Sequence, residues 1–456
     1  MQQYSTIAAI STPLAAGGIG IIRLSGKEAI NIATTLFTPI GERNLTNCKG
    51  FSAIYGKLSD IDGIIDDVIA TKYVSPKSYT GEDLVEFSCH GGIYILQRAL
   101  RACFSAGAVP AEPGEFTKRA FLNGKLDLTR AESVIDLINA NNKQAHLAAL
   151  SAREGRVFKQ IDTIKQSLIN VSAHLAVWAD YPEEDLPELQ DDVLLSNLSV
   201  IKDDLNKILS DYDKGSLYKD GVTTVIAGKP NVGKSTLMNL LAGSQRSIVT
   251  EIAGTTRDVV EDTVSLGNIV LRIADTAGIR DTEDIIEAAG VGLAKKRLET
   301  SSLVLAVFDS SSKLGEDDMK LIDMVKDRAV VAIVNKSDLP RAIDLEVISR
   351  SIPHIVEISA LDAVGIHKLE QAVQEVLKLD TLDLSASIVV NERQRNAVDL
   401  AMQAIQQAIS ALQASFTLDA VNVCVDEAVS KLCELTGENS SMAIVNEVFS
   451  KFCVGK

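Results

Sequence analysis

At the centre of the chain lies the octapeptide Gly228-Lys229-Pro230-Asn231-Val232-Gly233-Lys234-Ser235. It follows the β-branched run Val222–Ile226 and leads into Thr236–Leu241, which has the composition of a helix. A strand, a glycine loop ending in Gly-Lys-Ser and a helix are the setting of a phosphate-binding loop, whose backbone N–H groups point at phosphates. In such a loop Lys234 contacts the β- and γ-phosphate oxygens, and the Ser235 hydroxyl binds Mg²⁺. Taken alone, the pattern also fits an ordinary glycine-rich turn.

A second motif, Asp275-Thr276-Ala277-Gly278, comes just after the apolar run Ile269–Ile273. Asp275 is placed to reach Mg²⁺ through water, and the N–H of Gly278 to bond the γ-phosphate. Many small GTPases carry a glutamine at the next position to orient the attacking water, but this chain has Ile279. Hydrolysis therefore has to recruit another group.

A third motif, Asn335-Lys336-Ser337-Asp338, follows the run Val330–Val334. The Asp338 carboxylate accepts hydrogen bonds from guanine N1–H and the 2-amino group, neither of which adenine offers. Asn335 is expected to brace the loop, the Lys336 stem to cover the base, and Ser359-Ala360-Leu361 to supply a backbone N–H to O6. Three ordered motifs at strand ends predict a guanine-nucleotide domain.

Length and composition set the wider frame. The 456 residues exceed what one core usually serves, so about three domains are expected. The formal net charge of −16 gives little bulk attraction for nucleic acid, so any such contact needs a local basic patch or a partner's surface. No run is long and uncharged enough to span a bilayer, and no secretory signal begins the chain. Six scattered cysteines without metal-ligand spacing indicate reduced thiols in the cytosol.

The first 120 residues predict an α+β module. Ile19–Leu24 and Leu84–Cys89 have the pattern of strands, with Glu86 opposite the apolar side chains of its strand. Ile93–Ala106 has the pattern of a helix. The residues alone leave Arg23 as a solvated surface charge, because arginine is mostly exposed.

Helical patterns flank the nucleotide motifs on both sides. Thr129-Arg130-Ala131-Glu132 predicts a capping box, and little breaks the pattern from there to about Ala179. Asp180–Pro187 is an acidic, proline-broken connection or, alternatively, a metal site. Further helices are expected at Leu194–Leu209, Asn391–Leu412, Asp419–Gly437 and Glu438–Phe452. The flanks predict one discontinuous all-α helical domain interrupted by an inserted domain, although two separate bundles also fit.

The inserted domain has apolar β-branched runs separated by helical stretches, to which Leu303–Phe308 and Ile355–Ile358 also belong. Such alternation predicts a largely parallel sheet with helices on both faces, the fold of a Ras-like P-loop α/β domain. The predicted domain boundaries are 1–120, 121–217, 218–379 and 380–456.

Tyr79-Thr80-Gly81-Glu82-Asp83, His90-Gly91-Gly92, Pro113–Leu128 and the last five residues carry a resemblance that runs the full length of the chain. The chain resembles the MnmE (TrmE) family of tRNA-modification GTPases. The resemblance implies that the first domain is a dimerising, folate-binding domain related to the tetrahydrofolate-binding protein of the glycine cleavage system. It also implies contacts to formyl-tetrahydrofolate, for which the matching residues are Arg23, Glu86, Lys125 and Lys456.

The same resemblance implies K⁺ where other GTPases use an arginine finger. Its matching ligands are the Asn231 side chain and backbone oxygens of Thr250, Ile252 and Thr255, while Ser235 and Thr256 would bind Mg²⁺. The water-orienting acid matches Glu287, and the catalytic set becomes Glu287, Lys234, Thr255 and Asp275. The implied GTP contacts are Asn231, Val232, Gly233, Lys234, Ser235, Thr236, Thr250, Glu251, Ile252, Ala253, Gly254, Thr255, Thr256, Asp275, Thr276, Ala277, Gly278, Asn335, Lys336, Asp338, Ser359, Ala360 and Leu361.

The family's activity adds a carboxymethylaminomethyl or aminomethyl group to carbon 5 of the wobble uridine of certain tRNAs. It implies a homodimer that works in the cytoplasm with MnmG, a partner that uses FAD and NADH, and a tetrahydrofolate one-carbon unit. Cys453 matches the family's cysteine, but most single cysteines are buried hydrophobes. A ribosome-assembly GTPase and a folate-binding scaffold with a regulatory GTPase are the alternatives, although the chain shows no KH-type loop and no basic stripe.

Overall fold

The computed structural model describes residues 5–140, 142–180, 191–243, 262–267, 269–273, 301–379 and 391–456. The chain divides into two compact units, Met1–Ile135 with Arg153–Leu195 and Gln403–Lys456, and Asp136–Ala152 with Ser196–Met402. None of the helices within the described ranges is long and apolar enough to cross a membrane.

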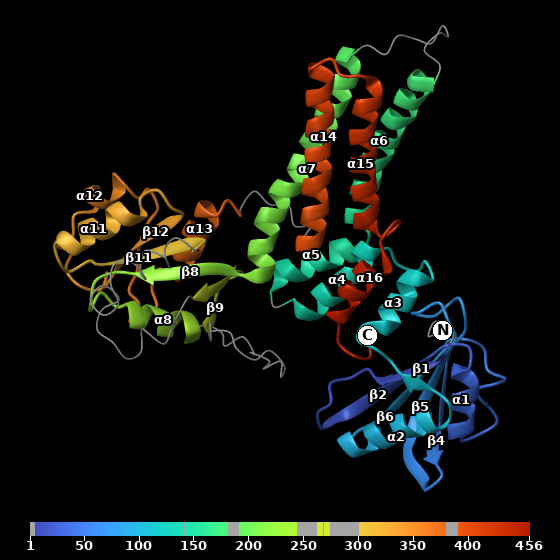
Figure 1. Ribbon diagram of the computed structural model, residues 1–456. Helices are drawn as coiled ribbons and strands as arrows, with labels where there is room; N and C mark the ends of the chain where they lie inside the picture. Colours follow the sequence, from blue (N-terminus) through green and yellow to red (C-terminus); the bar gives the residue numbers. More distant parts are fainter. Residues whose placement is uncertain are drawn as a thin grey trace. The chain divides into compact units, whose positions relative to one another are not determined.

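The first unit contains a seven-stranded sheet (Figure 1). Its strands are β1 (Ile7–Ile10), β2 (Gly17–Ser25), β3 (Phe37–Pro39), β4 (Ser52–Asp60), β5 (Gly63–Tyr73), β6 (Leu84–Gly91) and β7 (Val109–Pro110). The order across the sheet is β3-β4-β5-β6-β2-β1-β7, and only the β1–β7 pair is parallel among these strands. The strands predicted around Arg23 and Glu86 are confirmed.

The two faces of this sheet differ in cover. Helices α1 (Ala29–Leu36) and α2 (Ile93–Ser105) pack on the face that carries Phe87 and its apolar neighbours. Glu86 points to the opposite face, as its alternation with apolar neighbours predicts. The predicted helix at Ile93–Ala106 is confirmed, whereas α1 and α3 (Glu115–Leu122) are too short to show a clear helical period in the sequence.

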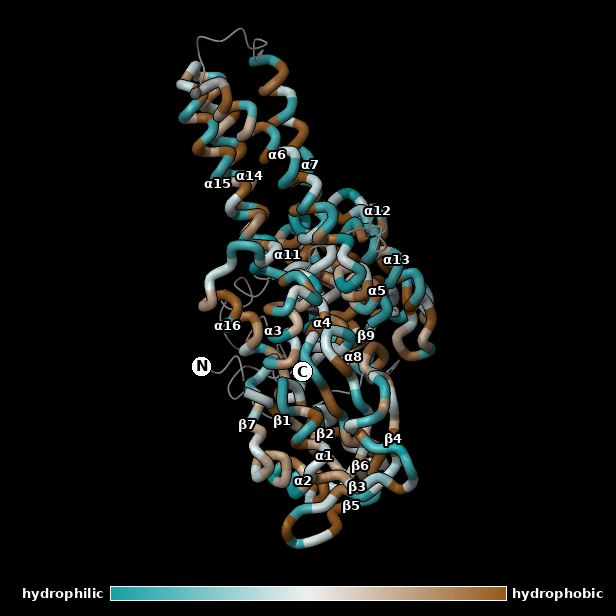
Figure 2. Tube along the Cα trace, turned by 90° about the vertical axis from the view of Figure 1, so that its right-hand side faces the viewer, coloured by the Kyte–Doolittle hydropathy of each residue, from teal (hydrophilic) through white to brown (hydrophobic). Residues whose placement is uncertain are grey.

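Each unit pairs a helix that precedes the inserted domain with one that follows it. In the first unit α6 (Arg156–Asp180) packs along α15 (Leu418–Thr436). In the second, Arg395 of α14 (Glu392–Gln413) lies over the ring of Tyr212 of α7 (Asp191–Asp220), 5.6 Å from its centroid. Polar and apolar residues alternate along α14 and α15, as expected of helices with one buried face (Figure 2). A single discontinuous helical domain stays a prediction.

Several helix limits differ from the sequence expectation. The long predicted helix is three helices, α4 (Leu128–Asn139), α5 (Lys143–Arg153) and α6. The predicted capping box at Thr129 is wrong, because the Asp127 carboxylate accepts the N–H of Arg130 at 3.0 Å and Thr129 lies within the first turn. The helix predicted at Leu194–Leu209 continues to Asp220. The one predicted at Glu438–Phe452 is α16 (Met442–Ser450), which the Ser441 hydroxyl caps.

The inserted domain contains a six-stranded sheet in the order β13-β12-β11-β8-β10-β9. Its strands are β8 (Val222–Ala227), β9 (Asp262–Leu266), β10 (Ile269–Ile273), β11 (Leu303–Asp309), β12 (Val330–Asn335) and β13 (Ile355–Glu357). All neighbouring pairs are parallel except β9 with β10, so the largely parallel sheet is confirmed. Helices α8 (Lys234–Gly243) and α13 (Ile366–Val376) cover one face, and α11 (Glu316–Val325) and α12 (Leu345–Ser349) the other.

Candidate functional site

The predicted phosphate loop connects β8 to α8 in a conformation that its glycines permit. A Cβ added to Gly228 would lie 2.5 Å from the carbonyl oxygen of Val307, so only glycine lets the loop pass so close to β11. Gly233 has a φ of +96°, in the left-handed region, and a Cβ there would lie 2.1 Å from Asn335 Nδ2. The strand, loop and helix predicted from the sequence are all present.

The side chains of this loop are arranged around the start of α8. Lys234 Nζ donates to the carbonyl oxygens of Gly228 at 2.7 Å and Lys229 at 2.9 Å, so its ammonium lies inside the loop. Ser235 and Thr236 are exposed in the first helical turn, where N–H groups and the helix dipole favour an anion. Asn231, also exposed, has a φ of +63°.

Asn335 joins the phosphate loop to the predicted base-binding loop. Its buried amide nitrogen donates to the carbonyl oxygen of Val232 at 2.9 Å, and its amide oxygen accepts the N–H of Ala360 at 3.0 Å. One side chain at the end of β12 therefore ties together three of the predicted nucleotide-binding segments.

The neighbouring Lys336 is held by an acid at the end of β11. Its Nζ lies 2.6 Å from Asp309 Oδ2, and the other Asp309 oxygen accepts from the backbone and hydroxyl of Ser311. Burial alone would raise the pKa of Asp309, but the hydrogen bonds from Lys336 and Ser311 outweigh it and the pKa is lowered. The Lys336 stem is thereby fixed beside the base loop.

Asp338 is positioned by the last predicted loop. The Ser359 hydroxyl lies 2.8 Å from Asp338 Oδ1 and 3.0 Å from Asp362 Oδ2. Ala360 is buried, whereas Leu361 is exposed. The structure thus brings together the predicted residues of the phosphate loop, the Asn335–Asp338 loop and the Ser359–Leu361 loop at the carboxyl ends of parallel strands, the usual ligand edge of such sheets.

The remaining predicted nucleotide and metal residues lie outside the described residues: Thr250, Glu251, Ile252, Ala253, Gly254, Thr255, Thr256, Asp275, Thr276, Ala277, Gly278 and Glu287. Within the described ranges no group of three metal-binding acids, histidines or cysteines occurs. The exposed Ser235 hydroxyl at the helix start still fits Mg²⁺, which takes one or two protein oxygens and completes its shell with phosphates and water.

A second candidate site lies on the sheet of the first unit, around Arg23. Its Nε donates to Glu86 Oε1 at 2.8 Å across the β2–β6 pair. The guanidinium lies over two rings, 5.6 Å from the centroid of Tyr79 and 5.5 Å from that of Phe116. Only 16% of the Arg23 side chain is exposed, so the expectation of a solvated surface charge is wrong.

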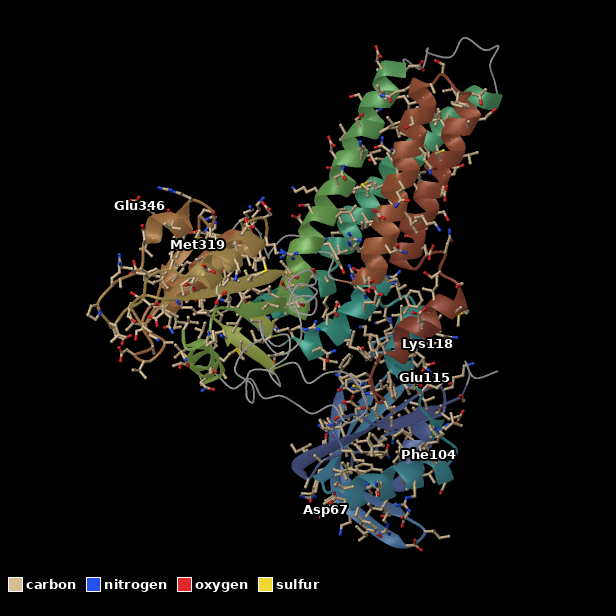
Figure 3. All side chains as sticks on the ribbon, turned by 60° about the vertical axis from the view of Figure 1, so that its left-hand side comes forward. Asp67, Phe104, Glu115, Lys118, Met319 and Glu346 are labelled. Atoms are coloured by element: carbon tan, nitrogen blue, oxygen red, sulfur yellow. The ribbon has the colours of Figure 1, made fainter. Side chains whose placement is uncertain are left out.

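The C-terminal tail completes this site. The Arg23 Nη1 and the Ser11 hydroxyl both donate to the carbonyl oxygen of Gly455, at 3.3 and 3.0 Å. The Phe116 N–H donates to a Lys456 oxygen at 3.1 Å, near the start of α3, where Glu115 and Lys118 are labelled in Figure 3. Both ends of the chain therefore build one polar cluster.

The surroundings of the Lys456 side chain lower its pKa. Burial lowers the pKa of its ammonium group, and the positive charges of Arg23 and Arg153 lower it further, while Glu86 acts in the opposite direction. Glu86 likewise helps burial to raise the pKa of Tyr73. Cations crowded against one carboxylate favour an anionic ligand.

Lys125 and Cys453 differ from the other predicted residues of this domain. Lys125 Nζ donates to the carbonyl oxygen of Pro76 at 2.9 Å on an exposed loop. Cys453 is exposed, and its carbonyl oxygen accepts the N–H of Gly114 at 3.3 Å. The structure therefore groups Arg23, Glu86 and Lys456, and records other contacts for Lys125.

Sequence reasoning missed the groups that enclose Arg23. Tyr79 is fixed by a hydrogen bond of 2.8 Å between its hydroxyl and that of Thr117. Gly455 has a φ of +95° and packs so closely against the carbonyl oxygen of Ile10 that a Cβ would not fit. The only signal for Tyr79 was its place beside the Thr-Gly-Glu run. A penultimate glycine gives no signal before its packing is seen.

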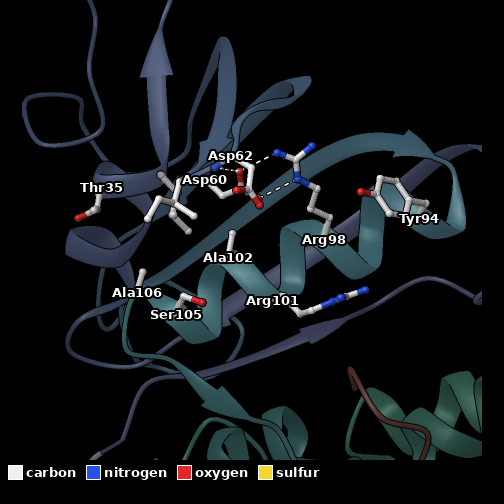
Figure 4. Close-up of a pocket in the computed structure, with 11 residues that line it drawn as sticks. Thr35, Asp60, Asp62, Tyr94, Arg98, Arg101, Ala102, Ser105 and Ala106 are labelled. Atoms are coloured by element: carbon white, nitrogen blue, oxygen red, sulfur yellow. Dashed lines mark hydrogen bonds and ion pairs between the residues drawn. The ribbon is translucent and has the colours of Figure 1, made fainter.

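A cavity of about 590 Å³ on the helical side of the same sheet is a weaker candidate (Figure 4). Arg98 of α2 crosses it to the carboxylate of Asp60, with bonds of 2.8 and 2.7 Å. These bonds lower the pKa of Asp60 and occupy both of its oxygens. The pair joins α2 to the β4–β5 hairpin and leaves no activated group for chemistry among the described lining residues.

Comparisons with known proteins match the chain over nearly its whole length. A family model described as the MnmE helical domain matches residues 128–453, and one for the GTP-binding protein TrmE N-terminus matches residues 6–125. Proteins named tRNA modification GTPase MnmE are 39% identical in Acetivibrio thermocellus, over 100% of both chains, and 40% identical in Carboxydothermus hydrogenoformans, over 99% of both. The G domain of the T. maritima FeoB iron transporter is 21% identical at a TM-score of 0.26 and covers 34% of this chain and 98% of its own, a likeness too weak to bear on the fold.

Proposed function

The chain belongs to the MnmE family, and from this premise we propose that it is a GTP hydrolase that acts in the modification of tRNA. The observation that carries the proposal is the joining of the phosphate loop to the guanine-binding loops through Asn335, which contacts Val232 and Ala360. A nucleotide bound along this edge would meet N–H groups at its phosphates and the Asp338 carboxylate at its base.

Hydrolysis needs charge neutralised on the transferring phosphoryl group and water oriented for attack. Lys234 supplies one charge, once its ammonium exchanges the carbonyl oxygens of Gly228 and Lys229 for phosphate. Mg²⁺ bound by Ser235 and Thr256 would supply Lewis-acid charge at the phosphates. We assign the orientation of water to Glu287, because Ile279 cannot bond it.

K⁺ dependence is the second part of the proposal, and Asn231 supports it. Asn231 is an exposed residue of the phosphate loop, and its side chain carries an amide oxygen of the kind that binds such a cation. With the backbone oxygens of Thr250, Ile252 and Thr255 it would form a site for a monovalent cation. GTP turnover should be fast in KCl and slow in NaCl of equal concentration, and Asn231→Ala should remove the difference. Asn239→Ala, at an exposed asparagine of the helix α8 that follows the loop, is the control. Equal rates in the two salts contradict the proposal.

The site around Arg23 is proposed to bind a reduced folate that carries a one-carbon unit. The donors of a pterin ring suit Glu86, and the carboxylates of a glutamate tail suit Arg23 and Lys456. Lys125 and Cys453 would act at its margin. With the folate bound, GTP hydrolysis would drive movement, and the FAD and NADH chemistry would belong to the partner MnmG.

A homodimer is proposed through the sheet face opposite α1 and α2. Tyr55 and Ile69 are cross-strand partners there and are 52% and 47% exposed. Tyr55→Asp together with Ile69→Asp should convert the dimer to a monomer in light scattering, whereas Phe416→Asp, at another exposed apolar position, should not. A dimer unaffected by the double substitution would remove this face from the proposal.

Mass spectrometry of wobble nucleosides from a strain lacking this protein tests the activity as a whole. Loss of the carboxymethylaminomethyl or aminomethyl uridine in the cytoplasmic tRNA is expected. Normal nucleosides together with accumulating ribosomal precursors would support a ribosome-assembly GTPase instead.

A further inference from the structure

The side chain of Lys229, the second residue of the phosphate loop, forms an ion pair with helix α11. Its Nζ lies 2.9 Å from Asp318 Oδ2 and 3.4 Å from the hydroxyl oxygen of Ser312. Asp318 lies in the first turn of α11 and is only 2% exposed. The same carboxylate oxygen accepts the N–H of Gly315 at 2.9 Å, which caps the helix.

The two faces of α11 identify Asp318 as the inward position. The next residue, Met319, labelled in Figure 3, is 47% exposed. Successive helical residues point about 100° apart, so Asp318 can face the loop while Met319 faces solvent. The ion pair is therefore held by the packing of α11 and does not depend on a mobile surface side chain.

The backbone of Lys229 has a separate contact within the loop. Its carbonyl oxygen accepts from Lys234 Nζ at 2.9 Å. Lys229 is thus fixed at its side chain by α11 and at its carbonyl by the lysine that serves the phosphates. A shift of Lys229 would therefore displace the Lys234 ammonium group and reorient the neighbouring backbone N–H groups.

The segment between Asp309 and Asp318 serves both halves of the nucleotide site. Its first residue holds Lys336 of the base loop at 2.6 Å, and its last holds Lys229 of the phosphate loop. In the proposed binding of GTP, Lys336 of the base loop would lie beside the base and Lys229 of the phosphate loop beside the phosphates, so the two acids would act on different parts of the nucleotide. Changing the Lys229–Asp318 pair should therefore affect phosphate recognition and leave base recognition intact.

We propose that Lys229 and Asp318 form a positioning pair that sets the geometry of the phosphate loop and hence its affinity for the nucleotide's β- and γ-phosphates. The inference rests on the proposed binding of GTP at this edge. Neither residue is assigned contact with the reacting atoms, because Asp318 acts through Lys229 and Lys229 acts through the loop backbone and Lys234.

The test is a double-mutant cycle on the full chain with Lys229→Met, Asp318→Asn and both together. Lys229→Met leaves the buried Asp318 carboxylate without its cationic partner and lowers the stability of the protein. The double variant removes that charge and restores the stability. Affinities for GDP and GMP are measured by fluorescence titration, and melting temperatures by calorimetry. GDP affinity should fall about tenfold in both single variants and also in the double variant, although its stability is restored. GMP affinity should change less than about threefold in all three.

Lys320→Met is the matched control, because Lys320 also lies on α11 but pairs at 3.2 Å with the exposed Asp317. It should leave GDP affinity within about twofold. A double variant that regains both stability and full GDP affinity would show that the pair only stabilises the fold, and would overturn the inference. Equal weakening of GDP and GMP would also overturn it, and a wild-type protein that binds no guanine nucleotide would overturn the proposed function as well.

Discussion

The inserted domain and the N-terminal domain build their sites in opposite ways. The nucleotide site is made of contiguous motifs, each placed at the end of its own strand, and Asn335 then joins two of them over 103 residues. The site around Arg23 has no contiguous motif of its own. Its arginine meets a glutamate on the neighbouring strand and a carbonyl oxygen 432 residues away.

The difference explains what each site depends on. Residues within one loop are fixed by local backbone geometry, which phosphate binding itself requires. A cluster assembled from both chain ends depends on the docking of the last few residues, which contribute little core. Damage to the tail should therefore abolish one site and leave the other untouched, and the two sites can be broken separately.

The largest effect is expected at Asp338, where a change should break the nucleotide site alone. Asp338→Asn removes the acceptor for the guanine 2-amino group and provides a donor that fits the 2-oxo group of xanthine. GTP affinity should fall roughly 10³-fold while XTP affinity rises, because a mismatched polar group is left unpaired. Folate binding, followed by calorimetry on the same sample, should be unchanged. GTP affinity within tenfold of wild type would contradict the assigned role of Asp338.

Removal of Gly455 and Lys456 is the reciprocal change and should have the next largest effect. It deletes the acceptor for Arg23 and Ser11, the contact with the Phe116 N–H and one ammonium group. Affinity for a reduced folate should fall about 100-fold, corresponding to about 2.7 kcal/mol. GTP hydrolysis measured in parallel should stay within about twofold of wild type. A truncated chain that still binds folate fully would show that the tail is not part of the site.

These two variants also separate what the sequence could predict from what it could not. The strands of the inserted domain are apolar runs followed by motif residues, so their positions and the roles expected of Asn335 and Asp338 are visible without a structure. Arg23 has no such signal. Its cover comes from Tyr79, Phe116 and Gly455, which reach it only after distant parts of the chain have folded together.

The predicted ends of the helices were wrong for a related physical reason. The breaks between α4, α5 and α6 fall at short polar or glycine-containing segments that do not interrupt the apolar period. Gly155 adopts a φ of +80°, and only the structure shows that it turns the chain there. The periodic pattern predicted the presence of helix, and local backbone chemistry set where each helix ends.

The pH dependence of folate binding sharpens the comparison, because it depends on the buried tail. Since burial and the neighbouring Arg23 and Arg153 lower the pKa of Lys456, its charge is lost at a lower pH than that of an ordinary lysine. Folate affinity should fall as the pH rises through that pKa. Between the folded and unfolded pKa values the unfolded chain binds more protons, so the free protein gains stability as the pH rises.

Lys456→Arg provides the check, because a guanidinium keeps its charge across this range. The folate affinity of this variant should persist to higher pH. At the alkaline end it should be about tenfold higher than that of the wild type, because the wild type has lost the charge contact made by Lys456. GTP affinity should show the same pH profile in both proteins. Identical folate profiles would mean that another group controls the alkaline loss.

The smallest effect is expected at Lys125, where the resemblance and the geometry can be separated. Its ammonium already donates to the Pro76 carbonyl oxygen on an exposed loop, so Lys125→Ala should weaken folate binding only about threefold, the scale of an exposed charge contact. Lys118→Ala, on α3, is the control and should have no effect (Figure 3). Arg23→Ala should weaken folate binding far more, because it also removes the ion-pair partner of Glu86. If Lys125→Ala weakens folate binding as much as Arg23→Ala, the loop at Pro76 must move Lys125 into the cluster when folate binds, and the N-terminal site is then larger than the three side chains grouped around Arg23.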